Sequence, residues 1–258
     1  MYDLETRKHA LALVAQGRSL NAVSKQTGIS RWCLRSWQKR ITPLPRLVSE
    51  PCPICAPDHR ELAEAPYSYL LGLYLGDGCI SQAPRGTGTY LRIACTKSWP
   101  GLIDECRRAI TAVCPDRTSY IVERPGDVMV TSYGHHWTCL FPQHGPGRKH
   151  ERRIELAPWQ RKIVDAHPWA FIRGLVHSDG CRITNWATRT VAGVRKRYEY
   201  PRYFFTNTSD DIIRLFTDAL DRVGVEWKPA NQRRDAQNVS VAKRASVALM
   251  DAHVGPKY

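Results

Sequence analysis

No stretch of this 258-residue chain approaches the ~18 consecutive apolar residues that a membrane-spanning helix requires. The first five residues include two acids and lack the basic-then-apolar order of a signal peptide. Nine cysteines, an odd number scattered along the chain, are not typical of a disulfide framework either. We therefore expect reduced thiols, no membrane partner and a cytoplasmic location.

Acidic residues are scarce, with 24 Asp and Glu against 38 Lys and Arg, a net charge of +14 and a pI of about 9.6. Such a balance favours a polyanionic partner such as nucleic acid, although ribosomal and membrane-surface proteins share it. Hydrophobic residues make up 43% of the chain, which is enough to form a core. The length allows a small domain followed by a medium one.

Residues 1–45 read as a small all-α domain. Apolar spacing predicts a helix over 4–15, a short helix through 23–26 with Ser19 as its cap, and a third helix over 31–40 capped by Ser30. Residues 27–29 include Gly28 and predict the tight turn between the last two helices. This order is typical of a helix-turn-helix, and the segment resembles those of transposases and resolvases.

The third helix is strongly basic, and residues 1–49 hold nine Lys or Arg against two acids. We expect its apolar residues, Trp32, Leu34 and Trp37, to pack against the other two helices. We interpret the helix as a DNA-reading element, with a purely structural cap as the alternative. The candidate DNA contacts on it are Arg31, Arg35, Lys39 and Arg40.

Residues 46–65 form a proline-rich linker that contains Cys52-Pro-Ile-Cys55. A C-x-x-C pair suits two zinc thiolates, but a closed zinc site needs four ligands and the chain has no second C-x-x-C. His59 is a candidate third ligand. Structural zinc, a redox pair and no role at all remain open for these cysteines.

An internal repeat is visible at an offset of 102 residues. Residues 66–79 (PYSYLLGLYLGDGC) and 168–181 (PWAFIRGLVHSDGC) are identical at six of fourteen positions. Each copy opens with a proline at a plausible first helical position and closes with Asp-Gly at the helix end. Four further pairs are conservative, so chance is a poor explanation.

The segments that follow the two copies also match, so each unit reads α-β-β-α-β-β-α over 66–167 and 168–258. In the first unit we expect strands at 79–83, 90–96, 119–123 and 127–133 around a helix at 99–113. In the second we expect strands at 181–188, 201–206, 225–229 and 238–242, a helix at 210–223 and a last helix to about 253. The first hairpin of the second unit is longer and contains the basic stretch 193–197.

Gly72 and Gly174 fall mid-helix, where glycine costs about 1 kcal/mol relative to alanine. A close approach of another backbone segment would explain why glycine stands at these two positions. If the two helices pack through these glycines, Asp77 and Asp179 meet at one end. Two such carboxylates would raise each other's pKa and suit a divalent metal ion.

The motifs LLGLYLGDG (70–78) and IRGLVHSDG (172–180) resemble those of the LAGLIDADG homing endonucleases. The resemblance extends over 66–258 and implies an α+β fold in which one chain forms a pseudo-dimer with a pseudo-two-fold axis. It also implies a monomer that binds double-stranded DNA with two β-saddles flanking the central helices. The inner acidic position of the motif is Leu75 in one copy and His177 in the other, and a partly buried helix histidine is favoured over a solvent-positioning one for the latter.

By the same resemblance, the activity is site-specific, metal-dependent hydrolysis of both DNA strands, of the kind found in mobile elements. Mg²⁺ or Mn²⁺ would be held by Asp77, Asp179 and the backbone near Gly76 and Ser178. Lys243 occupies the place of a supporting basic residue in the second repeat, and the first repeat has no lysine at the equivalent place.

The saddle hairpins and the basic loop 144–150 supply the remaining candidate DNA contacts, the loop being a solvated connector in the alternative interpretation. These candidates are Arg85, Arg92, Lys97, Arg148, Lys149, Arg182, Arg189, Arg195, Lys196, Arg197 and Arg202. The alternative function is a transcriptional regulator on the same fold that binds DNA without cutting it, and a nucleoid-associated location fits both. RNA maturase and recombinase activities have no support beyond charge and the N-terminal helices.

Overall fold

The computed structural model describes residues 2–42, 51–56, 61–84, 86–233 and 236–258. The chain forms two compact units, Met1–Ser49 and Glu50–Tyr258. Much of the linker predicted over 46–65, together with His59 and Arg85, lies outside the described residues. Among the helices that the structure describes, none has the length and apolarity to cross a membrane.

The N-terminal unit contains helices α1 (Leu4–Ala15), α2 (Leu20–Thr27) and α3 (Arg31–Lys39). The Ser19 and Ser30 side chains accept hydrogen bonds from backbone N–H groups in the first turns of α2 and α3, which satisfies otherwise unpaired donors. Gly28 ends α2 with a φ of 71°, in the left-handed region that glycine adopts readily. All three helices predicted in this unit are confirmed.

A small core holds these three helices together, with Ala10, Val23 and Leu34 fully buried. Trp37 packs against the same core, as predicted, but Trp32 is 76% exposed, so its assignment to packing was wrong. Residues two apart lie on nearly opposite sides of a helix, so Trp32 cannot share a face with Leu34. It lies instead among the exposed basic residues of α3.

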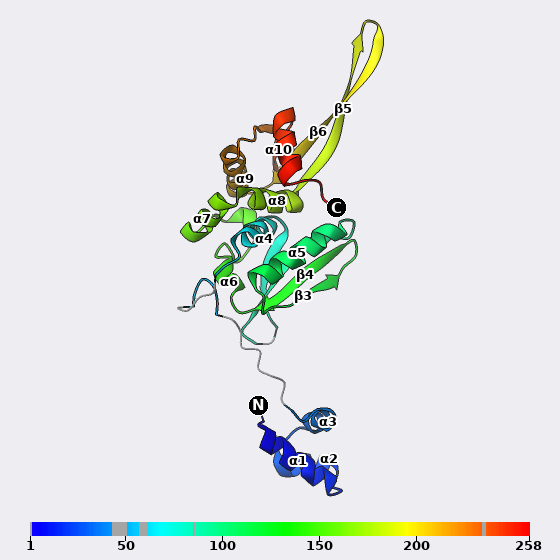
Figure 1. The fold of residues 1–258 in the computed structure, drawn as a ribbon, viewed down its shortest axis with the longest axis vertical. Helices are drawn as coiled ribbons and strands as arrows, with labels where there is room; N and C mark the ends of the chain where they lie inside the picture. The colour runs from blue at the N-terminus through cyan, green and yellow to red at the C-terminus, as the bar shows by residue number, and fades with distance from the viewer. Residues whose placement is uncertain (1, 43–50, 57–60, 85, 234–235) are drawn as a thin grey trace. The chain divides into compact units, whose positions relative to one another are not determined.

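The second unit contains two copies of one element order (Figure 1). The first comprises α4 (Glu64–Asp77), β1 (Gly78–Gln82), β2 (Thr89–Thr96), α5 (Pro100–Val113), β3 (Ser119–Glu123), β4 (Asp127–Gly134) and α6 (Trp137–Leu140). The second comprises α8 (Pro168–Asp179), β5 (Gly180–Val191), β6 (Val194–Asn207), α9 (Asp210–Arg222), β7 (Lys228–Arg233), β8 (Ala236–Val241) and α10 (Arg244–His253). The 3-10 helix η1 (Lys149–Glu151) and α7 (Pro158–Ala166) join the copies and were not predicted.

Each copy builds one antiparallel four-stranded sheet, in the order β1-β2-β4-β3 and β5-β6-β8-β7. The two sheets have the same topology because strands in equivalent sequence positions pair in the same way. The predicted α-β-β-α-β-β-α order is therefore confirmed in both copies, and the unit is a mixed α+β structure.

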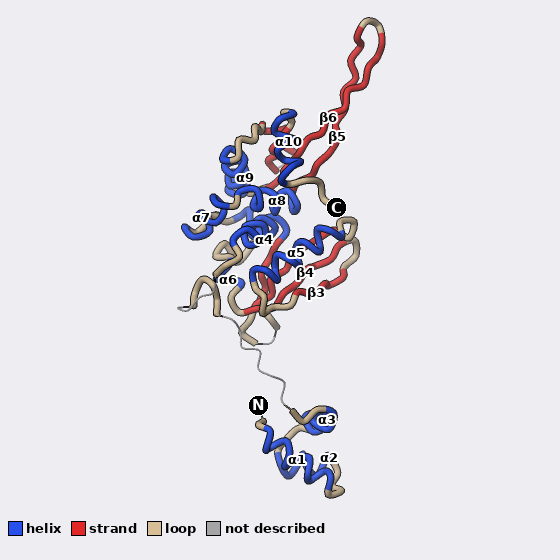
Figure 2. Tube along the Cα trace, in the orientation of Figure 1, coloured by secondary structure: helices blue, strands red, loops and turns tan. Residues whose placement is uncertain are grey.

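The β5–β6 hairpin is much longer than predicted and projects from the rest of its unit (Figure 2). The prediction left residues 189–200 outside the strands, whereas the structure pairs them up to Val191 and Val194. Ala192 and Gly193 form the connecting turn with φ values of 50° and 77°. Such a two-residue left-handed turn matches the twist of a hairpin and lets both strands continue to the tip.

Helices α4 and α8 pack against each other through Gly72 and Gly174, as predicted from the glycines. A Cβ atom built on Gly72 would lie 2.6 Å from the Phe171 carbonyl oxygen, and one on Gly174 would lie 3.0 Å from the Gly72 Cα. No larger residue fits at this distance, so the glycines bring the two backbones together. The first of these helices begins at Glu64, which makes Pro66 its third residue rather than its first. Proline is tolerated there because first-turn N–H groups have no partner within the helix.

Candidate functional site

Asp77 and Asp179 are the last residues of α4 and α8, the two helices that pack against each other through Gly72 and Gly174. A Cβ atom on Gly76 would overlap the Ser178 side chain and lie 3.0 Å from Asp179 Oδ2. The structure therefore brings the two predicted acids to one place. Each acid is followed directly by a glycine that is the first residue of the first strand of its sheet.

The surroundings favour the protonated form of both acids. Desolvation by the protein, and then the negative charge of Asp179, raise the pKa of Asp77 to about 6. Desolvation also raises the pKa of Asp179. Both residues nevertheless keep contact with solvent. Two partly desolvated carboxylates cannot compensate each other's negative charge. Because they remain accessible to solvent, the pair attracts cations.

Asn207, the last residue of β6, was not predicted as part of this site. Its Nδ2 donates to Asp179 Oδ2 at 2.7 Å, and its Oδ1 accepts from the backbone N–H of Ser209 at 2.8 Å. The second bond fixes the orientation of the amide. Asn207 thereby holds one carboxylate oxygen and leaves Asp179 Oδ1 for another ligand.

Lys149 lies against the end of α4. Its Nζ donates to the carbonyl oxygens of Tyr74, Gly76 and Gly78 at 2.6, 2.7 and 2.9 Å. Burial lowers the pKa of Lys149 to about 8, although Asp179 and Asp77 oppose this shift. The prediction assigned Lys149 to a DNA phosphate, but the structure directs its ammonium to the helix end, where free carbonyls attract a cation.

Lys257 has the equivalent position at the end of α8. Its Nζ donates to the Ser178 carbonyl oxygen at 2.7 Å, and burial lowers its pKa. The negative charges of Asp77 and Asp179 act on this lysine as well. Each motif helix therefore ends on one lysine that faces both acids, and neither lysine was predicted for this role.

The residues at this place fit a hard divalent cation, because the donors that face one another are carboxylate oxygens. The predicted backbone ligands Gly76 and Ser178 already accept hydrogen bonds from Lys149 and Lys257. A carbonyl oxygen has a second lone pair, so each retains one acceptor position. Asp77 and Asp179 are the primary ligands that the geometry offers.

Two further residues of the predicted site have different surroundings. Lys243 precedes α10 and forms an ion pair with Glu226, with 58% of its side chain exposed. His177 is buried, its Nδ1 is 3.0 Å from the Tyr69 hydroxyl, and burial lowers its pKa to about 4. The structure thus supports the buried-histidine interpretation of this position.

Exposed cations and aromatic rings line the β5–β6 hairpin. Arg189 faces Lys196 across the strands, and Ala187 and Tyr198, two positions along the ladder, lie on the same face. On the other face the Arg197 guanidinium lies 5.0 Å from the Trp186 ring centre, and Arg195 is exposed beside them. The hairpin therefore presents flat rings and positive charge on both faces.

The remaining predicted contacts on the sheets differ in how accessible they are. Arg202 and Arg92 lie over the rings of Tyr200 and Tyr90, at 5.4 and 5.2 Å. Two predicted contacts are instead engaged within the protein. Arg182 forms a bidentate pair with Asp251 at 2.6 and 2.9 Å, and Lys97 forms an ion pair with Glu123.

The predicted basic loop borders the carboxylate pair. A hollow beside Asp179 is lined by Arg148, Lys149, His150 and Asn207. Arg148 is largely exposed and lies 3.9 Å from Glu151. In the N-terminal unit, Arg31, Arg35, Lys39 and Arg40 are all exposed, as a DNA-reading helix requires.

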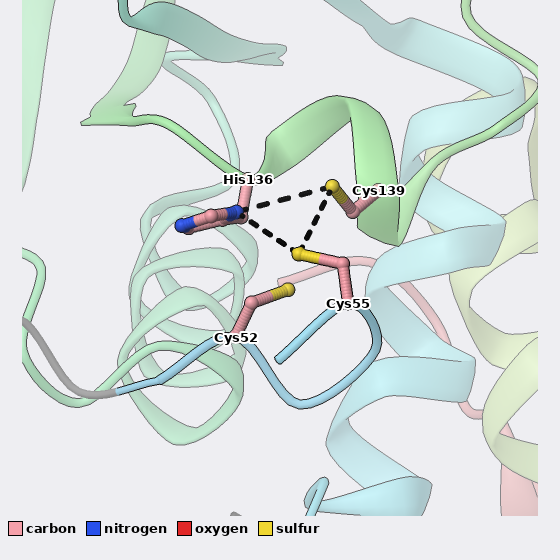
Figure 3. A group of neighbouring side chains, drawn as sticks. All are labelled: Cys52, Cys55, His136 and Cys139. Atoms are coloured by element: carbon pink, nitrogen blue, oxygen red, sulfur yellow. Dashed lines mark hydrogen bonds between the residues drawn. The ribbon is translucent and has the colours of Figure 1, made fainter. Parts of the chain in front are cut away.

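The structure also brings Cys52 and Cys55 together with two residues that were not predicted as ligands, His136 and Cys139 (Figure 3). The sequence contains a signal for them, because His136-Trp-Thr-Cys139 is a second ligand pair with a two-residue gap. This pair does not match the C-x-x-C pattern because its first member is histidine. The predicted third ligand, His59, lies outside the described residues.

Neither the models of known protein families nor the curated proteins match this sequence. Among solved structures, mesophilic variants of the homing endonuclease I-DmoI align with a TM-score of 0.49 at 14% identity, over 75% of this chain and 91% of that one. The LAGLIDADG meganuclease I-AabMI bound to uncleaved DNA gives a TM-score of 0.46 at 13% identity, over 73% and 84%. The N-terminal LAGLIDADG domain of DUF199/WhiA gives 0.44 at 10%, over 80% and 88%. At such identities, the function has to rest on this chain's own side chains.

Proposed function

We propose that the chain is a metal-dependent DNA endonuclease that hydrolyses both strands of a specific duplex site. The observation that carries this proposal is the meeting of Asp77 and Asp179 at the ends of two packed helices, beside the hollow that Arg148 lines. Two carboxylates bordered by cations are suited to hold a divalent metal ion against a phosphate group. A single chain supplies both acids, so a monomer acts as a pseudo-dimer.

Asp77 and Asp179 would hold Mg²⁺ or Mn²⁺. The cation would supply Lewis-acid stabilisation of charge on the phosphate oxygens and make water a stronger nucleophile at neutral pH. Asn207 keeps Asp179 oriented, since it donates to one oxygen of that carboxylate. Lys149 and Lys257 hold the backbone of both helix ends and place positive charge next to the acids.

The β5–β6 hairpin is the main DNA-binding element in this proposal. Its rings and cations suit a groove between two phosphate backbones, where side chains contact phosphates and base edges. Arg189, Arg195 and Lys196 are its exposed cations nearest the tip. The exposed basic face of α3 would bind a second stretch of duplex, as a helix-turn-helix does.

A non-cleaving DNA-binding regulator is the second candidate function, and one observation favours it. Lys149 and Lys257 already compensate the charge of the acids without a metal ion. A pair neutralised in this way could serve only to hold the two helix ends together. DNA binding would then persist without any strand cleavage.

The two functions are separated by incubating the full chain with a randomised duplex library and Mg²⁺ or Mn²⁺, then sequencing all cut ends. Asp77→Asn and Asp179→Asn are run in parallel, with wild type in EDTA. We expect staggered ends at one site in wild type only, and site selection by both variants. Selection of a site that is never cut by any of them would establish the regulator instead.

A further inference from the structure

A second cluster of ligand-type side chains lies away from the carboxylate pair. Cys52 and Cys55 come from the segment 51–56, His136 directly precedes α6, and Cys139 lies within α6. One ligand atom from each of the four lies within 4.8 Å of the others. Figure 3 shows the four side chains pointing toward one centre.

The separations within the cluster match a tetrahedral metal site. Cys55 Sγ is 3.4 Å from His136 Nδ1 and 3.7 Å from Cys139 Sγ, and the latter is 3.9 Å from the same nitrogen. Zinc bonds of ~2.3 Å to sulfur and ~2.0 Å to nitrogen place the ligand atoms of a tetrahedron roughly 3.4–3.8 Å apart. A disulfide would need its sulfurs at about 2.05 Å, so the arrangement suits a metal better than a bond between cysteines.

The local backbone explains why each pair converges. The Ala56 N–H donates to the Cys52 carbonyl at 3.3 Å, which folds the first pair into a turn. The Cys139 N–H donates to the His136 carbonyl at 3.1 Å, which folds the second pair into a turn that is one residue shorter. Two turns that face each other in this way present four ligands to one point.

We propose that this cluster is a structural Zn²⁺ site that fastens the segment 51–56 to the start of α6. Its ligands are the Sγ atoms of Cys52, Cys55 and Cys139 and the Nδ1 atom of His136. Three thiolates select zinc over Mg²⁺ or Ca²⁺, since hard cations prefer oxygen. Four protein ligands close the coordination shell and indicate a structural rather than a catalytic metal.

The site would connect the segment before α4 to the central helices. Leu140 in α6 accepts a hydrogen bond from the Tyr67 hydroxyl at 2.5 Å, and Phe141 stacks on Tyr74 with ring centres 4.4 Å apart. Both tyrosines belong to α4, and Tyr74 precedes Asp77 by three residues. The metal thus holds the chain that follows the N-terminal unit against the helix that ends in Asp77.

The test is the zinc content of the full chain purified without chelators, measured by inductively coupled plasma mass spectrometry. We expect about one zinc per chain in wild type and in Cys33→Ser, whose cysteine belongs to α3. Cys139→Ser and His136→Ala should bring the content close to zero. Co²⁺ added to metal-free wild type should give tetrahedral d–d bands and a thiolate charge-transfer band.

A second measurement does not depend on the variants folding. Wild type is labelled with a maleimide before and after treatment with a zinc-selective chelator in excess Mg²⁺. We expect protection of Cys55 and Cys139 that chelation removes, and constant labelling of the exposed Cys79 and Cys181. Metal-free wild type with no cobalt spectrum, or Cys139→Ser that keeps its zinc, would overturn the proposal. Neither readout depends on DNA cleavage.

Discussion

Lys257 donates from Nζ to the Ser178 carbonyl oxygen at 2.7 Å, one residue before Asp179. Lys149 makes the same contact with Gly76, one residue before Asp77. The two repeats thus share a lysine at the end of each motif helix, although the two lysines come from unrelated segments. We propose that these two lysines supply the support that was expected from Lys243.

Replacing these lysines should destabilise the helix ends and slow DNA cleavage. Lys149→Gln leaves three helix-end carbonyls without a charged donor, so we expect unfolding free energy to fall by about 1–3 kcal/mol. Cleavage should fall at least ~10-fold, which corresponds to about 1.4 kcal/mol of barrier. Lys257→Gln should act in the same direction. Single-turnover cleavage and urea denaturation measure both effects.

Lys243→Gln is the matched control, since that lysine pairs with Glu226 on the surface. We expect cleavage and stability close to those of wild type. A loss of cleavage in Lys243→Gln equal to that in Lys149→Gln would restore the original assignment of Lys243 to the site.

Metal binding at the carboxylate pair should depend on pH. Asp77 has a raised pKa of about 6, so its proton must leave before a cation binds. The apparent affinity for Mn²⁺ should therefore fall as pH drops below 6, by up to ~10-fold per unit for one proton. As pH rises through about 8, Lys149 loses its charge and the affinity should increase again.

Calorimetric titration with Mn²⁺ between pH 5 and pH 9 measures this dependence. Zinc-loaded protein is used throughout, so that the Cys/His cluster contributes nothing to the signal. Asp77→Asn should bind weakly at every pH and lose the lower transition. An affinity that stays constant from pH 5 to pH 7 would contradict the placement of the metal on Asp77.

The glycine contact should tolerate no side chain. In Gly72→Ala the new Cβ would meet the backbone of Phe171 and Leu175 at 2.6 and 2.7 Å, and backbone cannot give way as a side chain can. We expect a loss of about 2–3 kcal/mol in unfolding free energy, at the upper end for overpacking. Gly174→Ala should behave alike.

Gly126→Ala is the control that distinguishes a steric clash from the strain of a positive φ alone. Gly126 has a φ of 83° and open space where its Cβ would be, so its substitution should cost only about 1–2 kcal/mol. Denaturant unfolding compares the variants. If Gly72→Ala and Gly174→Ala lower the unfolding free energy less than Gly126→Ala does, α4 and α8 do not pack as closely as the structure indicates.

The hairpin should contribute to the salt dependence of DNA binding. Arg189→Ala combined with Lys196→Ala removes two cations that face each other across the strands. If both contact phosphates, the slope of log affinity against log salt should fall by about 1.8. Arg182→Ala serves as the control, because this arginine is held by Asp251. It should reduce stability and leave the slope unchanged.

The third helix of the N-terminal unit should add an independent contribution. Arg31→Ala, Arg35→Ala and Lys39→Ala together should lower the salt slope by up to ~2.7 without unfolding the unit, since all three residues are exposed. Lys8→Ala, on α1 and paired with Glu5, should change neither quantity. Fluorescence anisotropy on one duplex at several salt concentrations gives the slopes. Equal slopes for the triple variant and wild type would assign the N-terminal unit a role other than DNA binding.

The sequence by itself determined the repeat, the ends of both motif helices and the approach of Gly72 to Gly174. These features follow from residue order within one helix and from comparison of two equivalent segments. The turn at Ala192 and Gly193 was not predicted, because the strands of this longer hairpin were expected to cover only 181–188 and 201–206. Alternating side chains on a two-stranded ribbon leave both faces in water, so charge there is compatible with strand.

The tertiary structure alone decided which cations and thiols meet. Lys149 lies 73 residues from Gly76, and Cys55 lies 81 residues from His136. No periodicity links residues so far apart, because their contact depends on how α6 and the following loop pack against α4. Lys243 illustrates the same limit. Its place in the sequence, just after the last strand, suggested a supporting role, but its side chain pairs with Glu226. Local pattern specifies elements and their ends, and packing between elements specifies the partners of each side chain.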